Sequence, residues 1–194
     1  MKKLDILDAL EPVVEVFEDL GVPYYIGGSV ASSAHGMPRS TLDVDIAANL
    51  KRRHVRPLIK VLEPAYYIDE EMIMDAIARR SSFNLVHLET MIKVDVFVSR
   101  DRPYDRQAFQ RKRKHSLEAE RADMELYLAS AEDIVLNKLD WFRIGGEVSE
   151  QQWRDVQGVL KVQKGLLDME YLRQWAADLG LADLLERALS EAEI

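Results

Sequence analysis

Three aspartates embedded in apolar, β-branched runs are the residues of this chain best suited to chemistry. Asp43 and Asp45 stand at alternate positions of the run LDVDI, and Asp95 stands within IKVDVFV. Because side chains alternate along a strand, Asp43 and Asp45 would share one face while their apolar neighbours face the core. Carboxylates held close together repel one another, and bound Mg²⁺ relieves that repulsion. The pattern therefore predicts a cluster of two Mg²⁺ ions, which Mn²⁺ can replace.

A glycine turn precedes the first two aspartates, in the stretch GGSVASSAHGMPRSTLDVDI. Glycines between a strand and a helix let backbone N–H groups approach a phosphate, and the helix N-terminus favours its negative charge. We therefore expect the amides of Gly27, Gly28 and Ser29 to hold the phosphates of a nucleoside triphosphate. A lone Gly-Gly or D-x-D is usually an ordinary turn or strand, but their order and spacing favour a joint site. The turn has no Walker-type lysine and no GxGxxG, so those modes of phosphate binding are unsupported.

Helices and strands alternate in the part of the chain that must position these residues. Apolar spacing predicts helices at residues 4–20, 29–35, 51–63 and 72–79. Strands are expected at residues 24–26, 42–47, 66–68 and 124–128, with a hairpin formed by residues 83–88 and 92–98. The hairpin carries Asp95 to the same sheet as Asp43 and Asp45.

The rest of the chain reads as helical. Ser130 with Asp133, and Ser149 with Gln152, have the spacing of helix N-caps, and Asp168 begins a third helix. A fourth helix is expected at residues 182–192. We predict an α+β fold with a mixed-sheet domain over residues 1–128 and a helical C-terminal domain over residues 129–194.

Composition narrows the function classes. The chain has 194 residues, of which 47% are hydrophobic, enough for one core with a helical appendage. Its net charge of −8 argues against coating nucleic acid through bulk charge. The absence of cysteine excludes disulfides, thiolate zinc sites and thiol nucleophiles. No signal peptide or membrane-spanning run is recognisable, so we expect a cytoplasmic protein.

These residues resemble the nucleotidyltransferases of the DNA polymerase beta superfamily, and more closely the AbiEii-like branch of bacterial nucleotidyltransferase toxins. The head domain of CCA-adding enzymes shares the plan more loosely. The matching positions are Gly27, Gly28, Ser29, Ala31, Gly36, Arg39, Ser40 or Thr41, Asp43 and Asp45. The resemblance implies a polymerase beta-like core that uses Asp43, Asp45 and Asp95 as metal ligands and catalytic residues. It further implies that Arg39 and Thr41 help to bind the nucleotide.

The family also carries an E-D-x-x-x-x-K-L run at the start of its helical half. The matching residues are Glu132, Asp133, Lys138 and Leu139, and Asp155 matches a later acid. By this resemblance Lys138 contacts the triphosphate, while Asp155 positions the nucleotide or the lysine. The alternatives are an exposed helix lysine for Lys138, and a surface pair with Arg154 or Lys161 for Asp155.

The reaction implied is transfer of a nucleoside monophosphate from an NTP, such as ATP, to an acceptor hydroxyl. Two basic runs, one from Lys51 to Arg56 and one from Arg100 to His115, are candidate contacts for RNA phosphates. Tyr104 and Phe109 lie in the second run, where they could stack on bases. The alternative interpretation is a solvated helix face and a solvated loop.

The toxin branch implies the 3′ end of tRNA as acceptor and a cognate antitoxin as partner. A protein side chain modified by AMP is the second option, and a small drug-like acceptor is the third. Outside catalysis, the chain could be a partner-binding, antitoxin-like protein on the same fold. The intact Gly-Gly-Ser turn and the three aspartates favour an enzyme.

Overall fold

The computed structural model describes residues 6–38, 40–116 and 125–194 and divides the chain into two units. The first unit comprises Met1–Gly27 and Thr41–Leu128. The second comprises Gly28–Ser40 and Ala129–Ile194, so it takes the segment after the glycine turn together with the C-terminal helices. The domain boundary expected near residue 128 stays a prediction.

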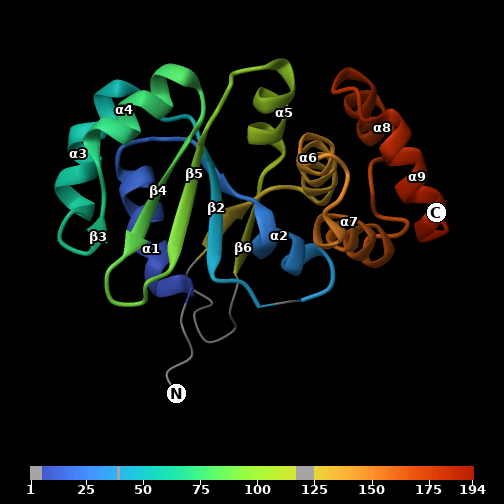
Figure 1. Cartoon of the computed structure of the whole chain (residues 1–194), viewed down its shortest axis with the longest axis horizontal. Coiled ribbons are helices and arrows are strands. Elements are labelled where there is room, and N and C mark those ends of the chain that lie inside the picture. Colours follow the sequence, from blue (N-terminus) through green and yellow to red (C-terminus); the bar gives the residue numbers. More distant parts are fainter. Residues whose placement is uncertain (1–5, 39, 117–124) are drawn as a thin grey trace. The chain divides into compact units, whose positions relative to one another are not determined.

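A mixed sheet forms the centre of the first unit. Within the described residues it has seven strands in the order β3-β4-β5-β2-β1-β7-β6. Their bounds are β1 Tyr24–Ile26, β2 Asp43–Ala48, β3 Tyr66–Tyr67, β4 Ser82–His87, β5 Lys93–Val98, β6 Arg113–Ser116 and β7 Glu125–Leu128. The pairs β2–β5 and β1–β7 are parallel and the other pairs are antiparallel. This confirms the predicted α+β fold and the hairpin of β4 and β5, which lie beside β2 in Figure 1.

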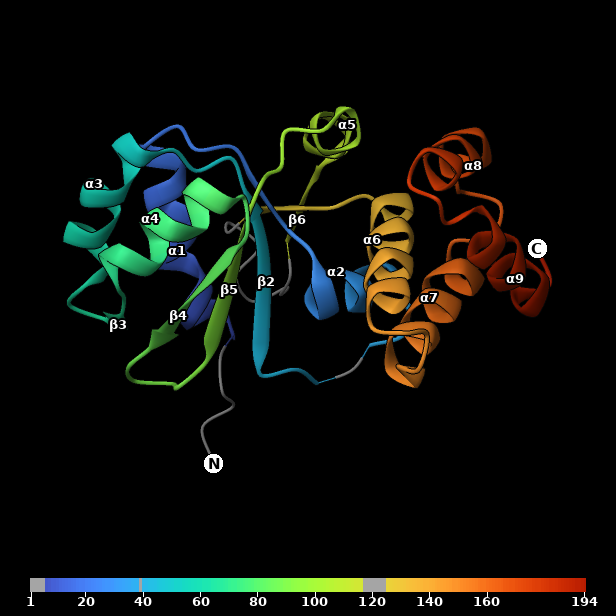
Figure 2. The same ribbon diagram turned by 45° about the horizontal axis from the view of Figure 1, so that its top comes forward.

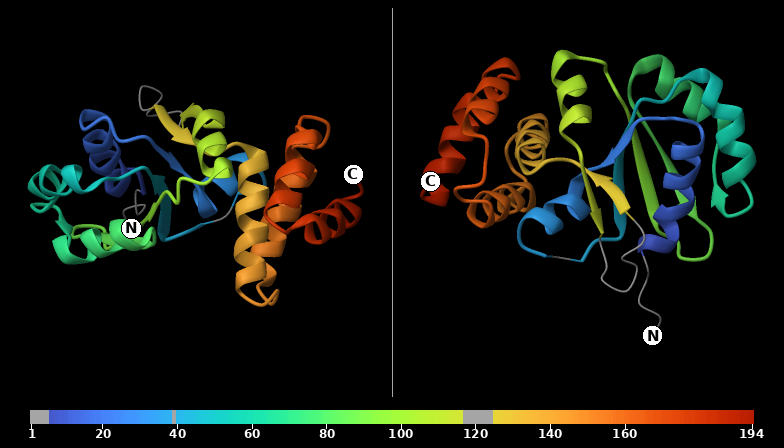
Figure 3. Two further views of the ribbon diagram at one scale, coloured as in Figure 1. Left: turned by 90° about the horizontal axis from the view of Figure 1, so that it is seen from above. Right: turned by 180° about the vertical axis from the view of Figure 1, so that it is seen from behind.

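One face of this sheet is buried. Alternate residues of β2 and β5, including Val44, Ile46, Val94 and Val96, are fully buried. Helix α1 (Ile6–Asp19) buries Leu10, Val13 and Phe17 and packs against β5. It lies behind the strands in Figure 1 and in front of them in the view from behind (Figure 3). Helices α3 (Arg52–Leu62) and α4 (Glu70–Arg79) pack on each other near β3 and β4.

The segment after Ser99 is structured, which corrects the solvated-loop interpretation of the second basic run. It forms helix α5 (Pro103–Arg111) followed by strand β6. Pro103 stands in the first turn, where its missing N–H costs nothing, and Asp105 accepts the Arg102 N–H at 3.1 Å. Tyr104 and Ala108, one turn apart, are buried. The high charge of the segment conceals this short apolar face.

The second unit is a helical bundle, seen in Figure 2. Its helices are α2 Gly28–His35, α6 Ala131–Ile144, α7 Glu150–Val162, α8 Met169–Asp178 and α9 Ala182–Ala192. The predicted caps are confirmed: Ser130 accepts from the Asp133 N–H, Ser149 from the Gln152 N–H and Asp168 from the Tyr171 N–H. No helix in the described ranges is long and apolar enough to cross a membrane.

Candidate active site

The three predicted aspartates lie on one face of the sheet, opposite the buried valines and isoleucine. In the parallel pairing of β2 with β5, Asp45 is directly beside Asp95, and Asp43 is beside Lys93. Asp43 is exposed, while Asp45 and Asp95 are half-buried. The alternation of apolar and acidic residues along each strand therefore produces a carboxylate face made of Asp43, Asp45 and Asp95.

Lys93 also lies on this face, and the sequence analysis missed it. Its Nζ atom lies 2.8 Å from Asp95 Oδ2 and 4.0 Å from Asp43 Oδ1. The hydrogen bond to Asp95, together with the charges of Asp95, Asp43 and Asp45, raises the pKa of Lys93 above its ordinary value despite partial burial. The signal was present in the sequence, because Lys93 and Asp95 are two positions apart on a strand and share a face.

Asn84 is a second residue that the sequence analysis missed. In the antiparallel pairing of β4 with β5 it stands directly beside Asp95, on the side away from Asp45. Asp45, Asp95 and Asn84 thus form a polar row across three strands. Only the register of the hairpin reveals it, because Asn84 stands in a run without any other chemical signature.

The carboxylate face fits Mg²⁺ by the chemistry of its donors. Mg²⁺ is held in proteins by one or two carboxylates together with substrate phosphates. An oxygen of Asp95 already contacts a cation, the Lys93 ammonium. Among the described residues no three carboxylate or imidazole groups converge as metal ligands in their present positions. A bound ion would therefore require the carboxylates to converge, with Asp95 released from Lys93.

The glycine turn joins β1 to α2 in the way that the sequence predicts. The Gly27 N–H donates to the Asp45 carbonyl oxygen at 2.8 Å, so this amide is used to fasten the turn to β2. Gly28 begins α2 with a φ of +53°, a conformation that favours glycine. Gly28 and Ser29 stand in the first turn of α2, the end of a helix that carries a partial positive charge.

The linker that leads into β2 contains two more predicted residues. Thr41 lies before the strand, where its hydroxyl donates to the Asp43 carbonyl oxygen at 3.1 Å. Thr41 therefore shapes the entry to the carboxylate face. Arg39 lies outside the described residues.

Lys138 and Asp155 meet within the second unit. Lys138 Nζ, on α6, lies 2.6 Å from Asp155 Oδ2, on α7, and the two side chains are only 6% and 9% exposed. These exposures correct both surface alternatives, because Lys138 is not a solvent-exposed lysine and Asp155 is not a surface acid. Lys138 donates a hydrogen bond to Asp155, and the role of either residue towards a nucleotide stays a prediction.

The two acids that precede Lys138 in the family pattern are structural. Asp133 is fully buried and accepts hydrogen bonds from the Ser130 hydroxyl at 2.8 Å and the Tyr171 hydroxyl at 2.7 Å. Glu132 accepts from the Asp168 N–H at 2.9 Å. Both acids fasten the start of α6 to the start of α8.

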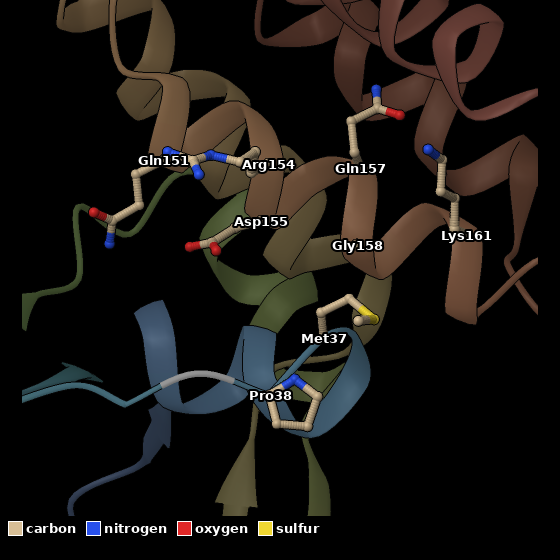
Figure 4. A pocket seen from close by; sticks show the side chains of 8 residues that line it. All are labelled: Met37, Pro38, Gln151, Arg154, Asp155, Gln157, Gly158 and Lys161. Carbon is tan, nitrogen blue, oxygen red and sulfur yellow. The ribbon is translucent and has the colours of Figure 1, made fainter.

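A pocket of about 530 Å³ opens beside Asp155 in the second unit. Its wall comprises Met37, Pro38, Gln151, Arg154, Asp155, Gln157, Gly158 and Lys161 (Figure 4). The pocket lies where the end of α2 approaches α7. A Cβ atom at Gly36 would stand 2.8 Å from the Val159 nitrogen and 3.0 Å from the Ser32 oxygen, so only glycine fits there. Gly36 thus permits the close packing that forms one wall of the pocket.

The two basic runs differ in the structure. Lys51, Arg52, Arg53 and Arg56 are exposed at the start of α3. His54 follows Arg53 in this run, and burial, together with the charges of Arg53 and Lys51, lowers its pKa.

In the second run several cations have acidic partners. Arg102 pairs with Asp105, Arg106 with Asp101 and Lys114 with Glu125. The stacking role expected for Tyr104 and Phe109 is corrected, since Tyr104 is 3% exposed and Phe109 packs against the Tyr25 ring at 5.0 Å. Arg56 of the first run also lies near an acid, with its Nε atom 3.5 Å from Glu70 Oε1. The start of α3 is nevertheless the more open of the two basic runs, because all four of its cations are exposed whereas Arg102, Arg111 and Lys112 are half-buried.

Comparisons with known proteins identify the fold. No protein-family model matches the chain, and no curated protein matches it significantly by sequence. The crystal structure of ANT(2")-Ia in complex with adenylyl-2"-tobramycin is similar, with a TM-score of 0.57 and 12% identity over 89% of this chain and 95% of that chain. An antigenic nucleotidyltransferase-like protein from Paracoccidioides brasiliensis has a TM-score of 0.52 and 17% identity over 91% of each chain. A putative nucleotidyltransferase from Thermotoga maritima has a TM-score of 0.50 and 16% identity over 80% of this chain and 96% of that chain. The chain therefore has the nucleotidyltransferase fold.

Proposed function

We propose that the chain transfers a nucleoside monophosphate from an NTP to an acceptor hydroxyl. The observation that carries this proposal is the register of β2 and β5, which sets Asp45 beside Asp95 with Asp43 on the same face. A nucleotidyltransferase fold with this face intact is more economically explained by catalysis than by binding alone. Asp43, Asp45 and Asp95 are accordingly the proposed catalytic residues.

These three carboxylates are the proposed ligands of Mg²⁺, or of Mn²⁺ in its place. The bound ion would contact phosphate oxygens and lower the pKa of the acceptor hydroxyl. Asp95 is also the proposed acceptor of the hydroxyl proton. The hydroxyl oxygen bonds to the α-phosphorus, the bond from that phosphorus to its bridging oxygen breaks, and pyrophosphate leaves with the electron pair.

In addition to Gly27, six residues are proposed to bind or position the nucleotide. The amides of Gly28 and Ser29 at the start of α2 suit phosphate oxygens, whereas Gly27 contributes by shaping the turn. Lys138 is the proposed cation for the triphosphate, and the Asp155 carboxylate orients it. Arg39 and Thr41 complete the proposed set. Arg39 is a further cation for the phosphates, and the Thr41 hydroxyl fixes the backbone at Asp43 by donating to its carbonyl oxygen.

For the acceptor we propose an RNA, the 3′ end of tRNA, as the resemblance to AbiEii-like toxins implies. The supporting observation is the basic start of α3, where Lys51, Arg52, Arg53 and Arg56 are exposed. Such a group of cations suits a phosphate backbone, and binding would weaken steeply with salt. By the same resemblance we propose a cognate antitoxin as the protein partner.

A small hydroxylated compound is the second candidate acceptor. It is favoured by the similar fold of ANT(2")-Ia, whose structure contains adenylyl-2"-tobramycin. The pocket beside Asp155 is of a size that suits a small molecule.

The test is incubation with Mg²⁺ and each α-labelled NTP in the presence of tRNA, of protein, or of a set of hydroxylated small molecules. Asp45→Asn is the test variant. Asp75→Asn is its matched control, because Asp75 is an exposed acid of α4 in the same unit. We expect label on an acceptor and release of pyrophosphate with the wild type and Asp75→Asn, and neither with Asp45→Asn. The labelled acceptor distinguishes RNA from protein and small molecule. Absence of any Asp45-dependent transfer or pyrophosphate release, with every NTP, would overturn the proposal in favour of a partner-binding protein.

A further inference from the structure

We propose that Lys93 is a resident cation of the carboxylate face, which pairs with Asp95, partly offsets the charge of Asp43 and must release Asp95 before a divalent ion binds. This inference rests on the proposed metal site and assigns a further positioning residue to it. Divalent metal binding is then an exchange of one cation for another.

The geometry of Lys93 supports this role. Its Nζ atom lies 2.8 Å from one oxygen of Asp95 and 4.0 Å from one oxygen of Asp43, so it contacts two of the three proposed metal ligands. On its other side the register neighbour of Lys93 is Val86, an apolar residue. The acids of β2 and β5 are therefore the groups of this sheet face that hold the ammonium.

The exposure of the pair shows that it can open. The Lys93 side chain is 41% exposed and that of Asp95 is 21% exposed. A lysine has a flexible four-carbon stem and a strongly hydrated head, so it can leave its partner for solvent at little cost. An ion pair with this much solvent contact contributes little to stability and can be replaced by a stronger ligand.

The charges of the carboxylate face explain what the Lys93 ammonium does there. Three like charges on one face of two neighbouring strands would repel one another in the absence of a cation. One ammonium relieves part of that repulsion and also holds Asp95 in an ion pair. The metal-free protein is thereby stabilised, and its affinity for a divalent ion without nucleotide is lowered.

The substitution Lys93→Met tests the proposal through two measurements of opposite sign. In a chelator at low salt, we expect the midpoint of thermal unfolding to fall by about 1–3 °C, because the repulsion is no longer relieved. In a titration followed by the EPR signal of free Mn²⁺, without nucleotide, we expect binding roughly three- to tenfold tighter than in the wild type.

Two matched variants serve as controls. Lys93→Arg keeps a cation at the position and should not bind Mn²⁺ more tightly than the wild type. Lys114→Met removes another strand lysine of the same unit, whose ion pair with Glu125 also measures 2.8 Å, and should leave Mn²⁺ affinity unchanged. Lys93→Gln repeats the test if Lys93→Met does not fold, as judged by circular dichroism.

Unchanged or weaker Mn²⁺ binding by a folded variant that lacks the lysine would overturn the proposal. The result is separable from the proposed reaction. Tighter Mn²⁺ binding without any nucleotidyl transfer would support Lys93 and contradict the proposed function. Asp45-dependent transfer with unchanged Mn²⁺ affinity in Lys93→Met would contradict Lys93 alone.

Discussion

Two lysine–aspartate pairs, one in each unit, have nearly the same length and very different surroundings. Lys93 and Asp95 are 2.8 Å apart on the open face of the sheet, with side chains 41% and 21% exposed. Lys138 and Asp155 are 2.6 Å apart between α6 and α7, with side chains 6% and 9% exposed. The contact distance therefore says little about the role of either pair. Burial decides how much stability is lost when one partner of such a pair is removed.

The largest expected effect comes from breaking the buried pair. Lys138→Met should lower the free energy of unfolding by about 3–5 kcal/mol, because it leaves the Asp155 carboxylate buried without its ammonium. Urea unfolding followed by circular dichroism measures this. A loss below about 1 kcal/mol would show that the pair is exchangeable after all and would erase the contrast with Lys93.

Removing the acid of the exposed pair should act on activity rather than on stability. Asp95→Asn is expected to lower the rate of nucleotidyl transfer by about 10²–10³-fold, since it removes a proposed metal ligand. Its free energy of unfolding should change by no more than about 1 kcal/mol. The rate of transfer is measured by pyrophosphate release and the free energy of unfolding by urea unfolding, each beside the Asp75→Asn control. An active Asp95→Asn enzyme would contradict the assignment of the sheet face.

Removing both partners of the buried pair should cost less than removing one. The double variant Lys138→Met with Asp155→Leu should recover most of the stability lost in Lys138→Met, to within about 2 kcal/mol of the wild type, because no uncompensated charge stays buried. A double-mutant cycle in urea provides the coupling energy. Additive losses would mean that the two side chains contribute through packing and not through their charges.

The smallest effect is expected for the exposed lysine. Lys93→Met in a chelator should lower the free energy of unfolding by about 1 kcal/mol or less, and 0.5 M salt should abolish the difference through screening. Unfolding curves at two salt concentrations measure this. A loss of several kcal/mol that persists in high salt would show that Lys93 contributes as much to stability as is expected of Lys138.

The sequence predicted the parts of the site that local patterns determine. Alternation in LDVDI and IKVDVFV predicted that the aspartates oppose the buried valines, and the caps at Ser130, Ser149 and Asp168 were confirmed. Strand register was not predictable in this way. The neighbours of Asp95, which are Asp45 on one side and Asn84 on the other, depend on which strands pair and in what register.

Burial was the other feature that local patterns did not determine. A single lysine on a helix looks exposed until a partner is known, and Asp155 lies 17 residues further along the chain on the next helix. Likewise, the buried face of α5 consists chiefly of Tyr104 and Ala108, and the surrounding basic residues conceal it. Tertiary contacts decide both cases.

The most direct test of the carboxylate face is a crystal structure with Mn²⁺ and a non-hydrolysable NTP analogue, recorded so that the anomalous signal of Mn²⁺ is measured. We expect an anomalous peak within about 2.0–2.3 Å of oxygens of Asp45 and Asp95, with the Lys93 ammonium displaced from Asp95. Mn²⁺ bound only elsewhere, with the pair of Lys93 and Asp95 intact beside a bound nucleotide, would contradict the assignment of this face as the metal site.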